Sequence, residues 1–443
     1  MKTFKIFMIV FLLTTIKCIE IQSQELNALK AKQFFSDIKL ITDKDNGQLW
    51  GVNLYGNLII IDSQTKIAYA NKNVPEGEWK EEEGVFIMQL PENAGISNTA
   101  MLINGEPWST VIYDTHIENQ FERTSLMIHE LFHQKQGILK IKPNYNLIDN
   151  MDNKDVRIWL FLEQQALLTA YESEGTKRVE AINDALLFRQ YRYKLFADDI
   201  KNANAFEIHE GLAQYTGILL SNAPKSYNYK NLKNMFSQLK ESPSVIRSYA
   251  YLSGPLYGLL LKDINNKWEH SVNDSSNLGD LLAQNYKINI IIKTQDELIN
   301  TAEKYDFYKI QKEETNREIL VKKQYENNKK LFVEGKILIL PQNFKIQFNP
   351  NNISPLKGYG KIYYTLNAQA DWGELIVNEQ GALILDDWSA IHVPVPENWN
   401  PNKGLNGKEW RLNLNNGYII KQEGKNWTVV KEMISESPET NKI

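Results

Sequence analysis

The sequence predicts an α+β protein, and three observations support that fold class. Residues from about Leu49 to Tyr113 fall into short β-rich runs. From Glu122 to about Asn285 the pattern becomes helical, with apolar residues at three- and four-residue spacings. The C-terminal part, from Lys336 onwards, returns to short β-rich runs between turns of glycine, asparagine and proline. We therefore expect an N-terminal β-sheet unit, a central helical domain and a small C-terminal β domain.

The composition limits the class of protein. The chain has 443 residues, of which 42% are hydrophobic and 23% charged, as in ordinary globular proteins, and its length suits two or three domains. The formal net charge is −4 and the sequence pI is about 6.0, so no basic face for a nucleic acid is indicated. Beyond the N-terminus no stretch reaches the length of a transmembrane helix, and we expect no integral membrane segment.

Residues 1–24 are predicted to form a signal peptide. Two lysines precede an apolar run over residues 6–13, which is too short to span a bilayer and is followed by polar residues. We expect export to the periplasm or the medium, with cleavage between Cys18 and Gln24. Cys18 is the only cysteine. Lipoprotein anchoring there is the less favoured alternative, because Ile16 and Lys17 stand where such a signal needs small residues.

The N-terminal unit, residues 25–121, is expected to contain a β-sheet. Asn104-Gly105 is a strong signal for a two-residue hairpin turn between the last two of its strands. The predicted strands lie within Leu54–Asp62, Lys66–Ala70, Gly84–Leu90, Thr99–Ile103 and Trp108–Tyr113.

The central domain, residues 122–335, is expected to be helical. Its longest periodic run, Asp155–Phe196, reads as one long helix. A charged helical segment follows at Thr294–Lys330, where Thr294 and Glu297 suit a capping box. Further helices are predicted at Ala203–Leu220 and Ser248–Asn265.

The C-terminal domain, residues 336–443, is predicted to be a small β-sandwich or barrel, because several short strands follow one another with turns between them. The predicted strands are Lys336–Pro341, Lys345–Phe348, Gly360–Leu366, Gly373–Val377, Leu383–Leu385 and Trp410–Leu414.

The helix-like stretch Ser125–Gly137 contains the motif H-E-x-x-H, with histidines at 129 and 133. Two histidines four residues apart lie on one face of a helix, so both imidazoles can reach one metal ion. Glu130 points toward the same open side, where it can accept a proton from a water molecule that the metal activates. In the alternative, these are ordinary polar residues of an amphipathic helix. The apolar residues around them disfavour it, since burying two histidines and a glutamate is costly without partners.

A catalytic zinc ion needs three protein ligands and one open position, so a third ligand is expected downstream of His133. The metzincin pattern fails, because Gln136 and Leu139 stand where it has glycine and histidine. Asp152 is a weak candidate in a loop-like stretch. Glu210 is the better one, with Glu207, one helical turn earlier, as the runner-up.

Two segments resemble gluzincin peptidases. Residues 207–215 contain E-G-L-A-Q-Y, which resembles the segment that carries the third zinc ligand in that family, and the resemblance implies that Glu210 binds Zn²⁺ together with His129 and His133. Residues 249–254 resemble the Y-x-x-G segment of aminopeptidase-type gluzincins, in which a tyrosine hydroxyl stabilises the oxyanion. Tyr251 matches that tyrosine, and Tyr249 is the alternative.

The resemblance covers roughly Ser125–Trp268 and departs from the family in two ways. The gap from His133 to Glu210 is 77 residues, longer than the family spacing, and the run Asp155–Phe196 would fill it as an inserted helix. No G-x-M-E-N segment precedes the metal helix, so an exopeptidase activity is unsupported. Gly211 and the alanine at 213 are expected to let the Glu210 helix approach the H-E-x-x-H helix closely.

These expectations combine into an exported zinc metallopeptidase, a hydrolase with a zincin-like catalytic domain that acts on a peptide or protein substrate. Glu130 would be the general base and Tyr251 the oxyanion donor. The alternative is a non-catalytic glycan- or peptide-binding protein on a zincin scaffold. In that case four tryptophans of the C-terminal domain would do the main work: Trp372, Trp388, Trp399 and Trp410.

Overall fold

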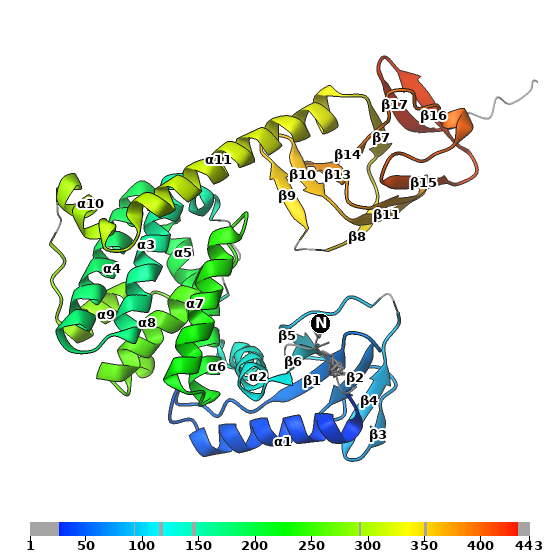
Figure 1. Ribbon diagram of the computed structural model, residues 1–443. Coiled ribbons are helices and arrows are strands. Elements are labelled where there is room, and N and C mark those ends of the chain that lie inside the picture. The colour runs from blue at the N-terminus through cyan, green and yellow to red at the C-terminus, as the bar shows by residue number, and fades with distance from the viewer. Residues whose placement is uncertain are drawn as a thin grey trace, which may run out of the picture. The chain divides into compact units, whose positions relative to one another are not determined.

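The computed structural model describes residues 26–92, 94–114, 118–143, 148–291, 294–349 and 352–432. The predicted signal peptide, and with it Cys18, lies outside these residues. The chain divides into two compact units, Met1–Lys312 and Glu313–Ile443. Helices and sheets occupy separate stretches of the chain, so the predicted α+β class is confirmed (Figure 1). Within the described residues, no helix is both long and apolar enough to cross a membrane.

The first unit begins with helix α1 (Ala28–Asp45), which the sequence analysis did not predict, and a six-stranded sheet. The sheet order is β3-β4-β2-β1-β6-β5, in which β1 and β6 are parallel and the other pairs antiparallel. Asn104 and Gly105 both have positive φ between β5 and β6, which confirms the predicted hairpin turn. The strands are β1 (Asn57–Asp62), β2 (Ile67–Ala70), β3 (Lys80–Glu82), β4 (Val85–Gln89), β5 (Thr99–Ile103) and β6 (Glu106–Tyr113).

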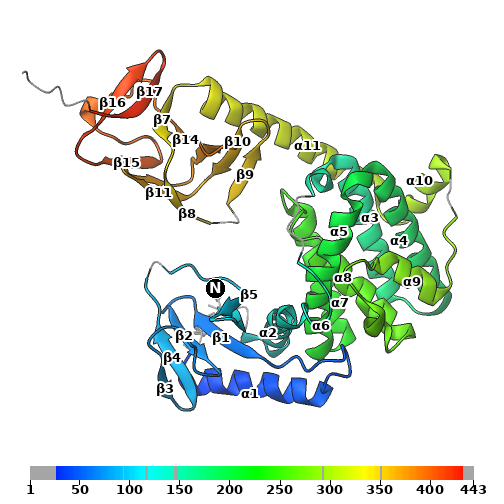
Figure 2. The ribbon, with the colours of Figure 1, turned by 180° about the vertical axis from the view of Figure 1, so that it is seen from behind.

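Helices follow the sheet. Helix α2 lies between the sheet and helix α6 (Figure 1, Figure 2). Helix α11 runs from the first unit into the second. The helices are α2 (Gln120–Lys135), α3 (Lys154–Glu172), α4 (Gly175–Leu195), α5 (Ile200–Phe206), α6 (Leu212–Leu220), α7 (Lys225–Glu241), α8 (Ala250–Ile264), α9 (Leu278–Tyr286), α10 (Gln295–Glu303) and α11 (Phe307–Lys329).

The prediction of one long helix over Asp155–Phe196 is wrong. The chain leaves the helical conformation at Ser173, and Gly175 has a positive φ of 55°, so α3 and α4 are separate helices that pack against each other. The predicted helix Thr294–Lys330 is also divided, into α10 and α11, with Asp306 at a φ of 63°. The capping box of Thr294 and its partner glutamate is confirmed.

The second unit contains two sheets that share one core. The seven-stranded sheet has the order β16-β17-β7-β14-β13-β10-β9, and the four-stranded sheet has the order β15-β12-β11-β8. Among the described residues no barrel is closed. Of the two expected forms, a sandwich or a barrel, this unit is therefore a sandwich. The strands are β7 (Ile337–Pro341), β8 (Lys345–Phe348), β9 (Ile353–Leu356), β10 (Gly360–Tyr363), β11 (Leu366–Ala370), β12 (Gly373–Val377), β13 (Ala382–Leu385), β14 (Ala390–Pro394), β15 (Trp410–Leu414), β16 (Tyr418–Glu423) and β17 (Asn426–Lys431).

Three of the four tryptophans proposed for ligand binding lie in this core. The indole N–H groups of Trp372, Trp399 and Trp410 each donate to a backbone carbonyl, and the side chains are buried. Trp388, which is 49% exposed, stacks against Phe344 at a centroid distance of 5.8 Å. Of these four tryptophans, only Trp388 is exposed enough to contact a ligand.

Candidate metal centre

Helix α2 presents the two motif histidines because its opposite face is fixed to the sheet. The helix begins after Asn119, whose side chain accepts hydrogen bonds from two backbone N–H groups of the first turn. The Ser109 hydroxyl of β6 donates to the carbonyl oxygen of Glu130 at 2.7 Å. With that face held, the histidine face is turned toward the helices.

Glu210 lies in a π-helical turn, Glu207–Gly211, which connects α5 to α6. Such turns insert an extra residue into a helix and often occur at functional sites. Helix α6 approaches α2 closely, as expected, but the contact is made by Gly217: a Cβ there would lie 2.2 Å from the carbonyl oxygen of Ser125. Gly211 instead faces Gly254 of helix α8, where a Cβ would lie 2.8 Å from the neighbouring Cα.

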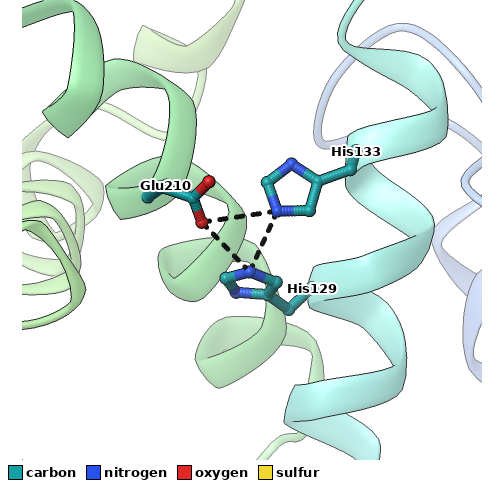
Figure 3. Close-up of side chains that lie close together, drawn as sticks. All are labelled: His129, His133 and Glu210. Carbon is teal, nitrogen blue, oxygen red and sulfur yellow. Dashed lines mark hydrogen bonds and ion pairs between the residues drawn. The ribbon is translucent and has the colours of Figure 1, made fainter. Parts of the chain in front are cut away.

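Three side chains meet between α2 and the π-helical turn (Figure 3). The Nε2 atoms of His129 and His133 are 3.0 Å apart, and each lies 3.5 Å from Oε2 of Glu210. Ligands bound at about 2.0–2.2 Å in a tetrahedral zinc site are roughly 3.3 Å from one another. The triangle therefore has the size of three ligands around one ion, and this group could hold a metal ion.

The group is partly accessible to solvent. His129 is buried, whereas His133 and Glu210 are only partly buried. Three protein ligands that leave a position accessible to solvent are the pattern of catalytic metal sites, while structural sites are closed by a fourth protein ligand. The arrangement can therefore admit water or a substrate to a bound ion.

Two glutamine side chains orient the imidazoles. The Nδ1 atom of His129 lies 3.1 Å from Oε1 of Gln214, and Nδ1 of His133 lies 2.8 Å from Oε1 of Gln136. An amide oxygen only accepts, so each Nδ1 carries the proton and each Nε2 keeps a free lone pair. Both lone pairs are thus available on the atoms that face Glu210.

The carboxylate of Glu210 is held in its ionised form. Burial alone would raise its pKa, but the close contact with the imidazoles of His129 and His133 outweighs burial and lowers the pKa well below its usual range. His209 Nδ1 lies 3.0 Å from Oε1, and the Tyr251 hydroxyl donates to Oε2 at 2.7 Å. Burial lowers the pKa of His129, which favours the neutral imidazole that a metal ligand requires.

Glu130 is a buried carboxylate without a hydrogen-bond partner for one oxygen. The residue is only 5% exposed, and among the described residues no group pairs with its Oε2 atom. Burial raises its pKa to about 7. A carboxylate with that pKa can both accept and return a proton near neutral pH, which is what general acid–base chemistry requires.

Tyr251 faces the group, whereas Tyr249 does not. The Tyr251 ring stacks on the His129 ring at 5.6 Å with an interplanar angle of 8°. Burial and the neighbouring Glu210 raise the pKa of the Tyr251 phenol, so it stays a hydrogen-bond donor at neutral pH. The Tyr249 hydroxyl instead donates to the carbonyl oxygen of Ala203 in the core.

The two other candidate ligands lie outside the group. Glu207 is buried in a polar network, where it pairs with Arg189 at 2.6 Å and accepts from the Ser253 hydroxyl. Asp152 accepts from the backbone N–H of Val245. The sequence analysis did not assign the orienting roles of the two glutamines. Their helical spacing of three from His133 and four from Glu210 is the signal that could have indicated them.

Compared with known protein families, with curated proteins and with solved structures, the chain matches none.

Proposed function

We propose that this protein is a zinc-dependent metallopeptidase that hydrolyses peptide bonds, of the gluzincin type that its motifs resemble. The observation that carries the proposal is the triangle of His129, His133 and Glu210, beside the unpartnered buried carboxylate of Glu130. A purely structural metal site does not require a buried carboxylate without a partner, and burying one costs free energy. We also propose, from residues 1–24, that the enzyme is exported.

Zinc fits the residues of the group better than the other common ions. Two imidazole nitrogens and one carboxylate oxygen form the donor set of known catalytic zinc sites, whereas magnesium and calcium prefer oxygen ligands alone. When bound, the zinc ion would polarise a carbonyl oxygen and lower the pKa of a water molecule.

The remaining chemistry would come from side chains. Glu130 follows His129 directly, and its free oxygen would accept the proton of the attacking water and then return it to the leaving amine. Tyr251 would donate its hydroxyl hydrogen to the oxyanion of the tetrahedral intermediate. Its present acceptor, Oε2 of Glu210, is the oxygen nearest to both histidines, so the donor already lies at the edge of the metal site.

The experiment is a cleavage assay on the purified protein with casein and a peptide library, with zinc, with a chelator, and with zinc restored after the chelator. We expect cleavage that the chelator abolishes and zinc restores. The variant Glu130→Gln should bind zinc and cleave nothing. Cleavage by this variant at the wild-type rate, or the absence of zinc from active protein, would refute the proposal.

The alternative, a non-catalytic glycan- or peptide-binding protein, is supported by the exposed Trp388. A pure binding protein gains nothing from Glu130, which favours the enzyme. A glycan array probed with the wild-type protein and with Trp388→Ala separates the two. Binding that depends on Trp388, together with no chelator-sensitive hydrolysis, would support the alternative.

A further inference from the structure

We propose that Gln136 is a positioning residue that sets the histidine His133 and the Glu210 turn at the spacing needed for metal binding. The inference rests on the proposed metal site. Gln136 is only 2% exposed. Its Oε1 lies 2.8 Å from Nδ1 of His133, and its Nε2 donates to the carbonyl oxygen of His209 at 2.6 Å.

The carbonyl oxygen of His209 decides how the amide of Gln136 is oriented. A backbone carbonyl only accepts, so the NH₂ group of Gln136 must face it, and the amide oxygen must face His133. That oxygen accepts the Nδ1 proton and leaves the Nε2 lone pair of His133 directed at Glu210. One amide therefore determines both the tautomer and the ring orientation of a ligand.

The same amide joins the two segments that supply the ligands. His209 directly precedes Glu210, and the carbonyl that accepts from Gln136 belongs to the peptide bond between them. Gln136 itself is fixed at the C-terminal end of α2: its N–H donates to the carbonyl oxygen of Phe132, and its own carbonyl accepts from the N–H of Ile141. The hydrogen bond thus spans from the end of α2 to the π-helical turn.

Comparison with Gln214 shows which contact distinguishes Gln136. Gln214 also contacts a ligand histidine, His129, at 3.1 Å. It lies on α6, the helix that continues from the π-helical turn, and it contacts α2 through the imidazole of a ligand. Gln136 instead contacts both a ligand histidine and the backbone beside Glu210, so one amide joins the two segments through the main chain.

The chain offers a matched control. Gln134 lies two residues before Gln136 on α2, and its amide also donates to a backbone carbonyl, that of Asn57, at 2.8 Å. Its side chain contacts the sheet on the opposite face of the helix. Gln134→Met therefore removes a similar hydrogen bond from the same helix without touching a ligand.

The first measurement is the Zn²⁺ dissociation constant, by competition with a chromophoric chelator, for the full-length wild-type protein, Gln136→Met and Gln134→Met. Loss of a partner that orients a metal ligand typically weakens metal affinity about 10–100-fold, and we expect a loss in this range for Gln136→Met. Gln134→Met should bind Zn²⁺ like the wild type even if its melting temperature falls equally. Unchanged affinity in Gln136→Met, or equal weakening in both variants, would overturn the inference.

The second measurement needs no metal and separates this inference from the proposed function. Proton–nitrogen correlation spectra of the metal-free protein, with labelled histidines and at a pH where imidazoles are neutral, report the tautomer of each ring. We expect His133 protonated at Nδ1 in the wild type and in Gln134→Met, and a mixture in Gln136→Met. His133 protonated at Nε2 in the wild type would overturn the inference even in an active peptidase. The expected tautomers in a protein without peptidase activity would refute only the proposed function.

Discussion

Gly211 and Gly254 touch through their backbones, where the π-helical turn crosses helix α8. A Cβ on Gly254 would lie 2.3 Å from the Cα of Gly211, a distance that side chains do not adopt. Glu210 immediately precedes the first of these glycines, and Tyr251 lies one helical turn before the second. The glycine contact is thus what brings the Tyr251 hydroxyl within 2.7 Å of Glu210.

Gly254→Ala should therefore disturb both stability and the site. The added methyl group meets backbone atoms that cannot rotate away, and we expect a loss of about 1–3 kcal/mol in the free energy of unfolding. Zinc affinity should fall as well. Gly137→Ala is the control, because a Cβ at Gly137 meets nothing within 4 Å, and its stability should stay within about 0.5 kcal/mol of the wild type. Urea denaturation measures both variants, and a Gly254→Ala protein as stable as the control would contradict the packing argument.

Tyr251→Phe should lower kcat while zinc stays bound. Removing one donor to an oxyanion typically costs about 10²–10³ in rate, and the phenyl ring keeps the stacking on His129. Tyr249→Phe is the matched control, since its hydroxyl donates to a core carbonyl and not to the site. It should cost roughly 1 kcal/mol of stability and leave kcat nearly unchanged. If Tyr249→Phe rather than Tyr251→Phe impairs turnover of peptide substrates, the assignment of the oxyanion donor is wrong.

The stability of the metal-free protein should depend on pH through Glu130. Burial raises its pKa in the folded protein from an ordinary value of 4.5 to about 7, so folding favours the protonated acid. This contribution is complete below pH 4.5, declines as the pH rises and is lost above pH 7. A shift of this size corresponds to about 3 kcal/mol.

Glu130→Gln removes that pH dependence, because the amide does not titrate. In excess chelator, the stability of the variant relative to the wild type should therefore increase by about 3 kcal/mol between pH 4.5 and 7. Urea denaturation at several pH values provides the comparison. A difference between the two proteins that stays constant over this range would mean that Glu130 is ionised in the fold at all these pH values.

The sequence was sufficient to predict the helix that carries the two histidines and to select the three residues of the metal group. The spacing of H-E-x-x-H places both histidines on one face of a helix, since four residues are about one turn. Five of the six strands of the N-terminal sheet were recognisable by their residue types, but β3, a short strand of three exposed charged residues, was not. Glu210 was found through a short local motif, although 77 residues separate it from His133. Each of these features can be recognised from residues that are close together in the sequence.

Features that depend on contacts between distant segments were not predictable. Gln136 appeared only as a mismatch to another pattern, because its role requires knowing that His209 lies beside the end of α2. Gly211 was expected to face α2, yet it contacts α8, and Gly217 makes the approach to α2. The break at Ser173 was missed because apolar residues recur at helical spacing on both sides of it.

The most direct test of the account is the zinc content of the purified protein after equilibrium dialysis against micromolar zinc. We predict one zinc ion per chain in the wild type and in Asp152→Asn, a control in which the altered carboxylate lies outside the metal group. Glu210→Ala should hold no zinc under the same conditions. Wild-type protein that binds no zinc, or Glu210→Ala that retains one zinc ion per chain, would contradict the proposed metal centre.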